Sequence, residues 1–187
     1  MGRWLHFGAG PNQLPAPWEN LNATHDIRKP LRFENGSVSR IHCEHVIEHV
    51  SFLQGFAFLG ECCRVLEPDG VLRLSFPDVT RMLNFLAPNV FGLHAAASAL
   101  GDAMATRERV IRELPVAERA RGALLALLTS WDHQAAWSRD LAAAVLLVHG
   151  FNDVRSVPYG SSEADGHHKD VGERWARIET TVMEAMK

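Results

Sequence analysis

Apolar residues in this chain fall into short runs separated by segments of helical spacing. Residues 4–7 form a short apolar run that stops at a glycine turn, which predicts a buried strand. Residues 18–22 and 39–43 are further short strand candidates, and 71–76 suits a central strand covered on both faces. From Ser51 to Leu66 the apolar residues recur every three or four positions, which predicts a helix with one buried face. The order of strand, turn, helix and strand predicts an α/β fold with a mostly parallel sheet covered by helices.

A turn signal and three further elements are predicted in the rest of the chain. Glu67-Pro68-Asp69-Gly70 should end the first helix before the strand at 71–76. A helix is predicted from Ser138, a suitable N-cap, to His149, with Gly150 after its end. Residues 153–159 and 178–186 are predicted to form a closing antiparallel pair of strands.

The stretch from residue 79 to about residue 130 has a different composition. It is rich in Ala, Leu, Arg and Glu, and it predicts two or three helices broken near Pro88 and Pro115. We interpret residues 88–130 as a helical insertion that covers the substrate side of the molecule.

Composition and charge narrow the class of protein. The 187 residues are 47% hydrophobic and 22% charged, which suits one globular domain over residues 1–187. The net charge of −3 and the lack of a Lys/Arg run give no basis for expecting a nucleic-acid partner. The three cysteines have no metal-type spacing, so we expect reduced, mostly buried thiols. With no apolar stretch of spanning length and no signal-peptide pattern, we expect a cytoplasmic protein that does not enter a membrane.

Three loops stand at predicted strand ends: Gly8 to Asn12, Glu44 to His49, and Pro77-Asp78. Ligands of open α/β sheets bind beyond the carboxyl ends of the strands, so these loops are the first places to look for a site. The glycines of Gly8-Ala9-Gly10 would let backbone approach a ligand closely. Taken alone, however, this motif is better explained as a structural turn, since Asn12 and Gln13 stand where a third glycine would be expected.

Taken together, several segments resemble class I methyltransferases of the type 11 group. In chain order they are LHFGAGPN at 5–12, WENLN at 18–22, DIRKPL at 26–31, EHVIEH at 44–49, ECCRVLEPDG at 61–70 and FPD at 76–78. The resemblance covers most of the chain and is weakest from about 88 to 130. It implies a Rossmann-like class I methyltransferase fold, S-adenosylmethionine as cofactor, and transfer of its methyl group to an acceptor, for which we expect a small molecule.

The resemblance also implies where the cofactor lies. The glycine turn would pack against its methionine part, Asp26 and the Ile27 backbone would meet adenine, and Asn22 falls at the ribose position. The implied cofactor residues are Phe7, Gly8, Ala9, Gly10, Asn12, Asn22, Asp26, Ile27, Glu44 and His45. Asn22 departs from the family pattern, because an amide lacks the charge of the usual carboxylate. Two explanations stay open: weaker but sufficient cofactor binding, or a non-catalytic relative that serves as a binding or partner subunit.

Candidate catalytic residues lie at the same strand ends. His45 would stand near the transferred methyl group, to position the acceptor or take its proton. His133, within Trp131-Asp132-His133, is a second candidate base. Asp78 would either orient the acceptor or cap the helix from Val79. This interpretation assigns no metal ligands, and it leaves open whether the protein forms a homodimer.

A competing hypothesis comes from His45-Val46-Ile47-Glu48-His49. This segment matches the H-x-x-E-H pattern of inverted zinc peptidases, in which two histidines bind zinc and Glu48 would act as base. Such a zinc hydrolase needs one continuous helix through both histidines and a third ligand downstream. The preceding strand is predicted to end near Glu44, which would place His45 in a loop and His49 at the start of the next helix. In that position Glu48 and His49 would be ordinary residues of a first helical turn.

Overall fold

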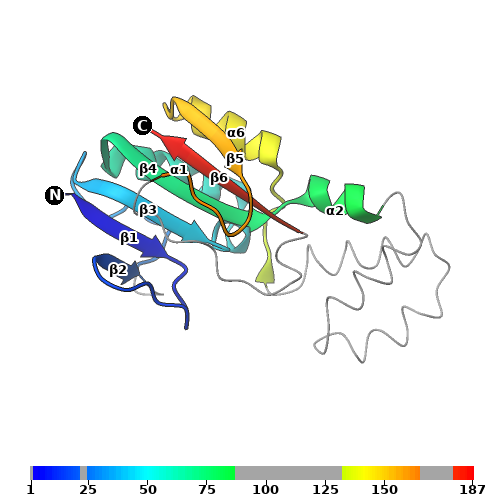
Figure 1. Cartoon of the computed structure of the whole chain (residues 1–187), viewed down its shortest axis with the longest axis horizontal. Helices are drawn as coiled ribbons and strands as arrows, with labels where there is room; N and C mark the ends of the chain where they lie inside the picture. Colours follow the sequence, from blue (N-terminus) through cyan, green and yellow to red (C-terminus); the bar gives the residue numbers. More distant parts are fainter. Residues whose placement is uncertain (1, 22–24, 87–131, 165–178) are drawn as a thin grey trace.

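The computed structural model describes residues 2–21, 25–86, 132–164 and 179–187. Along these segments three strands come first, followed by two helices, one strand, two further helices and two closing strands (Figure 1). The strands are β1 (Arg3–Phe7), β2 (Trp18–Leu21), β3 (Val38–Glu44), β4 (Leu66–Pro77), β5 (Asp153–Val157) and β6 (Thr180–Met186). The helices are the 3-10 helix η1 (Ile47–His49), α1 (Phe52–Val65), α2 (Val79–Leu86) and α6 (Arg139–Val148).

One sheet contains the six described strands in the order β2-β1-β3-β4-β6-β5. The first four in that order run parallel. β6 is antiparallel to both of its neighbours, β4 and β5. The predicted α/β class, the mostly parallel sheet and the antiparallel closing pair are therefore confirmed.

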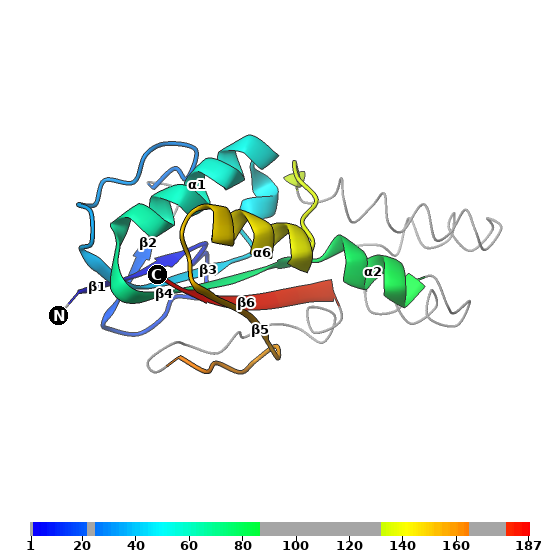
Figure 2. The same cartoon turned by 90° about the horizontal axis from the view of Figure 1, so that it is seen from above.

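Helices α1 and α6 lie side by side on one face of the sheet, whereas α2 continues past its end (Figure 2). The core lies between these two helices and the sheet, where alternate strand residues such as Leu5, Phe7 and Ile41 are fully buried. The ring of Phe7 packs edge-on against Phe58 of α1, with centroids 5.2 Å apart. This contact fixes the end of β1 against the helix layer.

Local sequence explains where the two core helices begin. Ser51 and Gln54 form a capping box, in which the Ser51 hydroxyl accepts from the Gln54 amide and the Gln54 side chain accepts from the Ser51 amide. Ser138 caps α6 by accepting from the Leu141 amide, as predicted. Gly150 follows the end of α6 with a φ of 98°.

The start of β4 differs from the prediction. The strand begins at Leu66, directly after α1, whereas the sequence indicated a turn and then a strand from Val71. Leu66 pairs with Val38 and Val71 pairs with Arg40, so the turn residues 67–70 form an irregularity inside the strand. The turn chemistry was interpreted correctly, but pairing on both sides of it extends the strand.

A hydrogen-bonded clamp holds the loop between β2 and β3 on α1. The Arg64 guanidinium donates to the carbonyls of Leu31 and Phe33 and to Glu61, and Glu61 accepts from the Leu31 amide. The Glu61–Arg64 pair keeps the pKa of Glu61 below its usual value. The loop that carries Asp26 therefore ends in a well-anchored segment.

Several predictions fall outside the described residues, namely the helical insertion at 88–130, Asn22 and Trp131. The cysteines are free and buried, as expected, and burial raises the pKa of the Cys43 and Cys62 thiols well above the usual value. Among the described residues, no helix is both long and apolar enough to cross a membrane.

Candidate active site at the carboxyl edge of the sheet

The order of the strands creates a switch point between β1 and β3. From β1 the chain first adds β2 on one side and then adds β3 on the other. The loops that leave β1 and β3 therefore diverge at neighbouring strand ends. In open α/β sheets this is where ligands bind.

The Gly8 turn is packed tightly against the exit of β3. A Cβ atom at Gly8 would lie 2.4 Å from Val46 Cγ2 and 2.6 Å from the Glu44 carbonyl oxygen, and the Gly8 φ is 80°. Only glycine fits this position without strain. Gly10 also has a positive φ, of 46°, but a Cβ there would meet nothing nearer than 3.8 Å. The turn thus combines one glycine required by close packing with a second, exposed glycine that is not crowded.

Other predicted cofactor residues divide into buried and exposed groups. Phe7, Ala9 and Ile27 are buried, so only their main-chain atoms are in a position to meet a ligand. Asn12 is exposed, and its amide donates to the Ala9 carbonyl over 2.7 Å, which closes the turn. No helix follows Gly10 in the described residues 11–21, which contain Pro11, Pro15 and Pro17.

Asp26 is held by its neighbour Arg28. The Arg28 guanidinium donates to both carboxylate oxygens over 2.7 and 3.0 Å, and the Arg28 amide donates to Oδ1. The Arg28 hydrogen bonds keep the pKa of Asp26 below its usual value. Asp26 is therefore an ionised acceptor at neutral pH.

His45 follows β3 in a left-handed backbone conformation, with a φ of 50°. This conformation is uncommon for a residue with a side chain and often marks a functional site. The Nδ1 atom of His45 lies 3.2 Å from Glu48 Oε1, and its Nε2 atom lies 3.1 Å from the Thr180 hydroxyl. Burial lowers the pKa of His45, but the carboxylates of Glu48, Glu179 and Glu44 outweigh burial and raise it.

Glu48 is the centre of a group of histidines. Its side chain is 2% exposed. Besides His45, it has His49 Nε2 at 4.0 Å, and the His49 ring stacks edge-on with His133 at 4.9 Å between centroids. The two predicted bases His45 and His133 thus approach the same carboxylate from different parts of the chain.

Sequence analysis missed Glu179 and Thr180, which contribute to the surroundings of His45. Thr180 pairs with Pro77 at the carboxyl end of β4, and Glu179 comes directly before it. Burial, opposed by His45 and reinforced by Glu48, raises the pKa of Glu179 to about 7. The predicted antiparallel strand was the available signal, because such a strand must begin at the carboxyl edge of its parallel neighbours.

The Asp78 carboxylate accepts four hydrogen bonds from described residues. Oδ1 accepts from the amides of Thr80 and Arg81. Oδ2 accepts from the Arg139 amide over 3.0 Å and the Thr181 hydroxyl over 2.7 Å. The side chain is buried and caps the start of α2, so the geometry favours the capping alternative over the catalytic one.

The H-x-x-E-H segment lacks the backbone that an inverted zinc peptidase requires. Its 3-10 helix spans only Ile47–His49, and His45 lies before it in the left-handed region. His45 and His49 therefore do not stand one turn apart on a continuous helix. Glu48, which would have to serve as a base, has its carboxylate buried.

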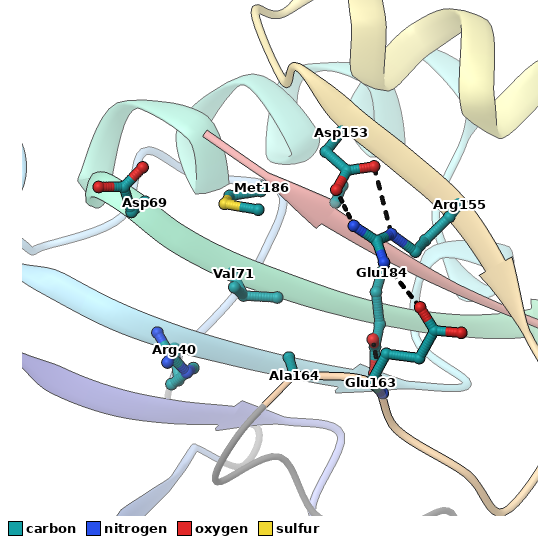
Figure 3. A pocket seen from close by; sticks show the side chains of 10 residues that line it. Arg40, Asp69, Val71, Asp153, Arg155, Glu163, Ala164, Glu184 and Met186 are labelled. Atoms are coloured by element: carbon teal, nitrogen blue, oxygen red, sulfur yellow. Dashed lines mark hydrogen bonds and ion pairs between the residues drawn. The ribbon is translucent and has the colours of Figure 1, made fainter.

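A described cavity of about 230 Å³ lies elsewhere, near the amino ends of the parallel strands (Figure 3). Arg155 lies at this cavity and contacts both Asp153 and Glu163, while Glu184 points in from β6. Arg40 and Val71, which are register partners on β3 and β4, line its other side. The cavity is thus separate from the switch point.

A twisted, mostly parallel sheet with helices and a glycine turn at its switch point defines a Rossmann-like α/β protein. Residues 11–74 match the type 11 family model described as a methyltransferase domain. The match covers about one third of the chain, so the chain is similar to that family over these residues.

Two solved structures illustrate the fold similarity. A SAM-dependent methyltransferase from Archaeoglobus fulgidus is 13% identical with a TM-score of 0.53, and the match covers 100% of this chain and 86% of that one. The CurJ carbon methyltransferase is 17% identical with a TM-score of 0.50 over 98% of this chain, which spans about half (48%) of that protein. No curated protein matches the sequence.

Proposed function

We propose that the protein is an S-adenosylmethionine-dependent methyltransferase acting on a small-molecule acceptor. The observation that carries this proposal is the Gly8 turn at the switch point. Its backbone lies against the exit of β3 so closely that a single Cβ would not fit, while a Cβ at the exposed Gly10 would meet only the Gly8 carbonyl oxygen, at 3.8 Å. Such a bare main-chain surface suits a ligand that must lie flat against the end of the sheet.

The described residues fit the chemistry of the cofactor. Asp26 is an ionised acceptor for the exocyclic amine of adenine. Main-chain atoms of the glycine turn are available for the methionine part. When bound, S-adenosylmethionine supplies an electrophilic methyl group on a sulfonium.

The remaining task of the protein is alignment, because methyl transfer needs the acceptor atom in line with the bond that breaks. His45 stands next to the exits of β3 and β4, with its Nδ1 atom 3.2 Å from the Glu48 carboxylate and its Nε2 atom 3.1 Å from the Thr180 hydroxyl. An imidazole fixed in this way is suited to orient an acceptor and to take its proton where the acceptor carries one. The ordered ring would support transfer to oxygen or nitrogen.

Replacing Asp26 by alanine tests the adenine position. Affinity for S-adenosylmethionine, measured by calorimetry against the wild type, is expected to fall on the order of tenfold, as for one charge-assisted hydrogen bond. Asp26→Asn is the matched control and should lose less, because its amide oxygen still accepts. Unchanged affinity in Asp26→Ala would place adenine elsewhere, without bearing on the glycine turn.

A further inference from the structure

Glu48, His49 and His133 form a cluster whose geometry suits a cation. One ligand atom from each residue lies within 4.8 Å of the other two. Two histidines and one carboxylate are a common ligand set for divalent transition metals such as zinc, manganese and iron. Two of these residues, Glu48 and His49, belong to the sequence pattern H-x-x-E-H. The third member of the cluster is His133, from a distant part of the chain, and not the first histidine of the pattern, His45.

A second observation points to a ligand at the same place. Glu48 is 2% exposed, and neither of its carboxylate oxygens accepts a hydrogen bond within the described part of the chain. Its Oε1 atom lies 3.2 Å from His45 Nδ1 and 4.0 Å from His49 Nε2. A buried carboxylate without a hydrogen bond raises the free energy of the folded protein, and a bound cation would offset that cost.

The backbone holds the two halves of the cluster together. The Glu48 carbonyl accepts from the amides of Gln134 and Ala135 over 2.7 and 3.2 Å. These bonds tie the segment after His133 to η1, so His133 is positioned by main-chain contacts. His49 is 39% exposed and His133 is partly exposed, which leaves a cation a route of entry from solvent.

A second group of ligand atoms, from His6, His42 and Glu44, is the rival location. His6 and His42 are direct register partners on β1 and β3, and each is 1% exposed. The Nδ1 atom of His6 lies 2.9 Å from Asn20 Oδ1. This group is closed to solvent on its histidine side, whereas the Glu48 group is open.

We propose that Glu48, His49 and His133 bind one divalent transition-metal ion at the carboxyl edge of the sheet. The ion would lie beside His45, where the proposed function places the acceptor. An acceptor with an oxygen atom able to contact the ion is then favoured, and this choice of acceptor class rests on the proposed methyltransferase function. The metal site itself does not depend on that function.

Titration with Co²⁺, followed by visible absorption and calorimetry, tests the site. The wild type is expected to bind one equivalent, and the affinity should fall more than about 100-fold in Glu48→Gln and His133→Ala, since even indirect ligand partners are worth 10–100-fold. His25→Ala, at a histidine outside both clusters, should bind as the wild type does. Circular dichroism of each variant without metal shows whether it folds.

A measurement on the wild type covers the case in which a variant fails to fold. Mn²⁺ is expected to broaden the ring resonances of His49 and His133 and to leave that of His25 sharp. No binding, or loss of binding in His6→Ala with retention in His133→Ala, would overturn the proposal. S-adenosylmethionine affinity measured in the presence of a chelator reports on the proposed function separately, so the two can fail independently.

Discussion

Replacing Gly8 by alanine is expected to destabilise the protein by about 2–5 kcal/mol and to remove cofactor binding. A residue with a Cβ pays about 1–2 kcal/mol for the left-handed backbone, and crowding in a packed site adds about 1–3 kcal/mol. The crowding is severe here because the added atom would meet the Glu44 backbone at 2.6 Å, and backbone cannot swing aside as a flexible side chain can. Denaturant unfolding measures the first effect, and calorimetry with S-adenosylmethionine measures the second.

Gly160 offers a matched control for this substitution. Its φ of 78° is nearly that of Gly8, but a Cβ there would meet no atom within 4 Å. Gly160→Ala should therefore show only the backbone cost of about 1–2 kcal/mol and should keep cofactor affinity. Equal effects at the two glycines would contradict the claim that the Gly8 turn is fixed by its contact with β3.

Replacing Arg73 by methionine is expected to lower the free energy of unfolding by about 3–5 kcal/mol. Arg73 donates to Glu184 over 2.8 Å, and the two side chains are only 1% and 5% exposed. The loss of Arg73 leaves the Glu184 charge buried without its partner, and this destabilises the protein far more than the loss of both charges would. Glu184 also accepts from the Ser162 hydroxyl and the Glu163 amide, so the strain would extend to the segment after β5.

The double variant Arg73→Met, Glu184→Gln provides the control. It removes the buried charge along with its partner, so much of the stability lost in Arg73→Met should return. Chemical denaturation of the wild type, both single variants and the double variant yields the coupling free energy. Additive effects, or a loss below about 1 kcal/mol in Arg73→Met, would show that the pair contributes little.

The layered arrangement of the fold could be predicted because it depends on local patterns. The apolar run at 4–7 stops at a glycine turn, and the capping pair Ser51 and Gln54 marks the start of α1 in the sequence. These signals act over a few residues. Their order along the chain is enough to indicate a parallel sheet and the loops at its carboxyl edge.

The detailed roles of the site residues depend on contacts that no local pattern contains. From the sequence, Asp78 could equally orient the acceptor or cap a helix. Arg139 and Thr181, which lie in distant segments of the chain, donate hydrogen bonds to its carboxylate and favour the helix cap. Glu48 looked like an ordinary residue of a first helical turn. Its burial among three histidines arises only because the segment after His133 folds back onto η1.

The direct test of the central claim is isothermal titration calorimetry of the full chain with S-adenosylmethionine and with its demethylated product. The account predicts that both ligands bind, with one site per chain, and that Gly8→Ala abolishes this binding. If neither ligand binds the folded wild type at millimolar concentration, the protein is not a methyltransferase of the proposed kind.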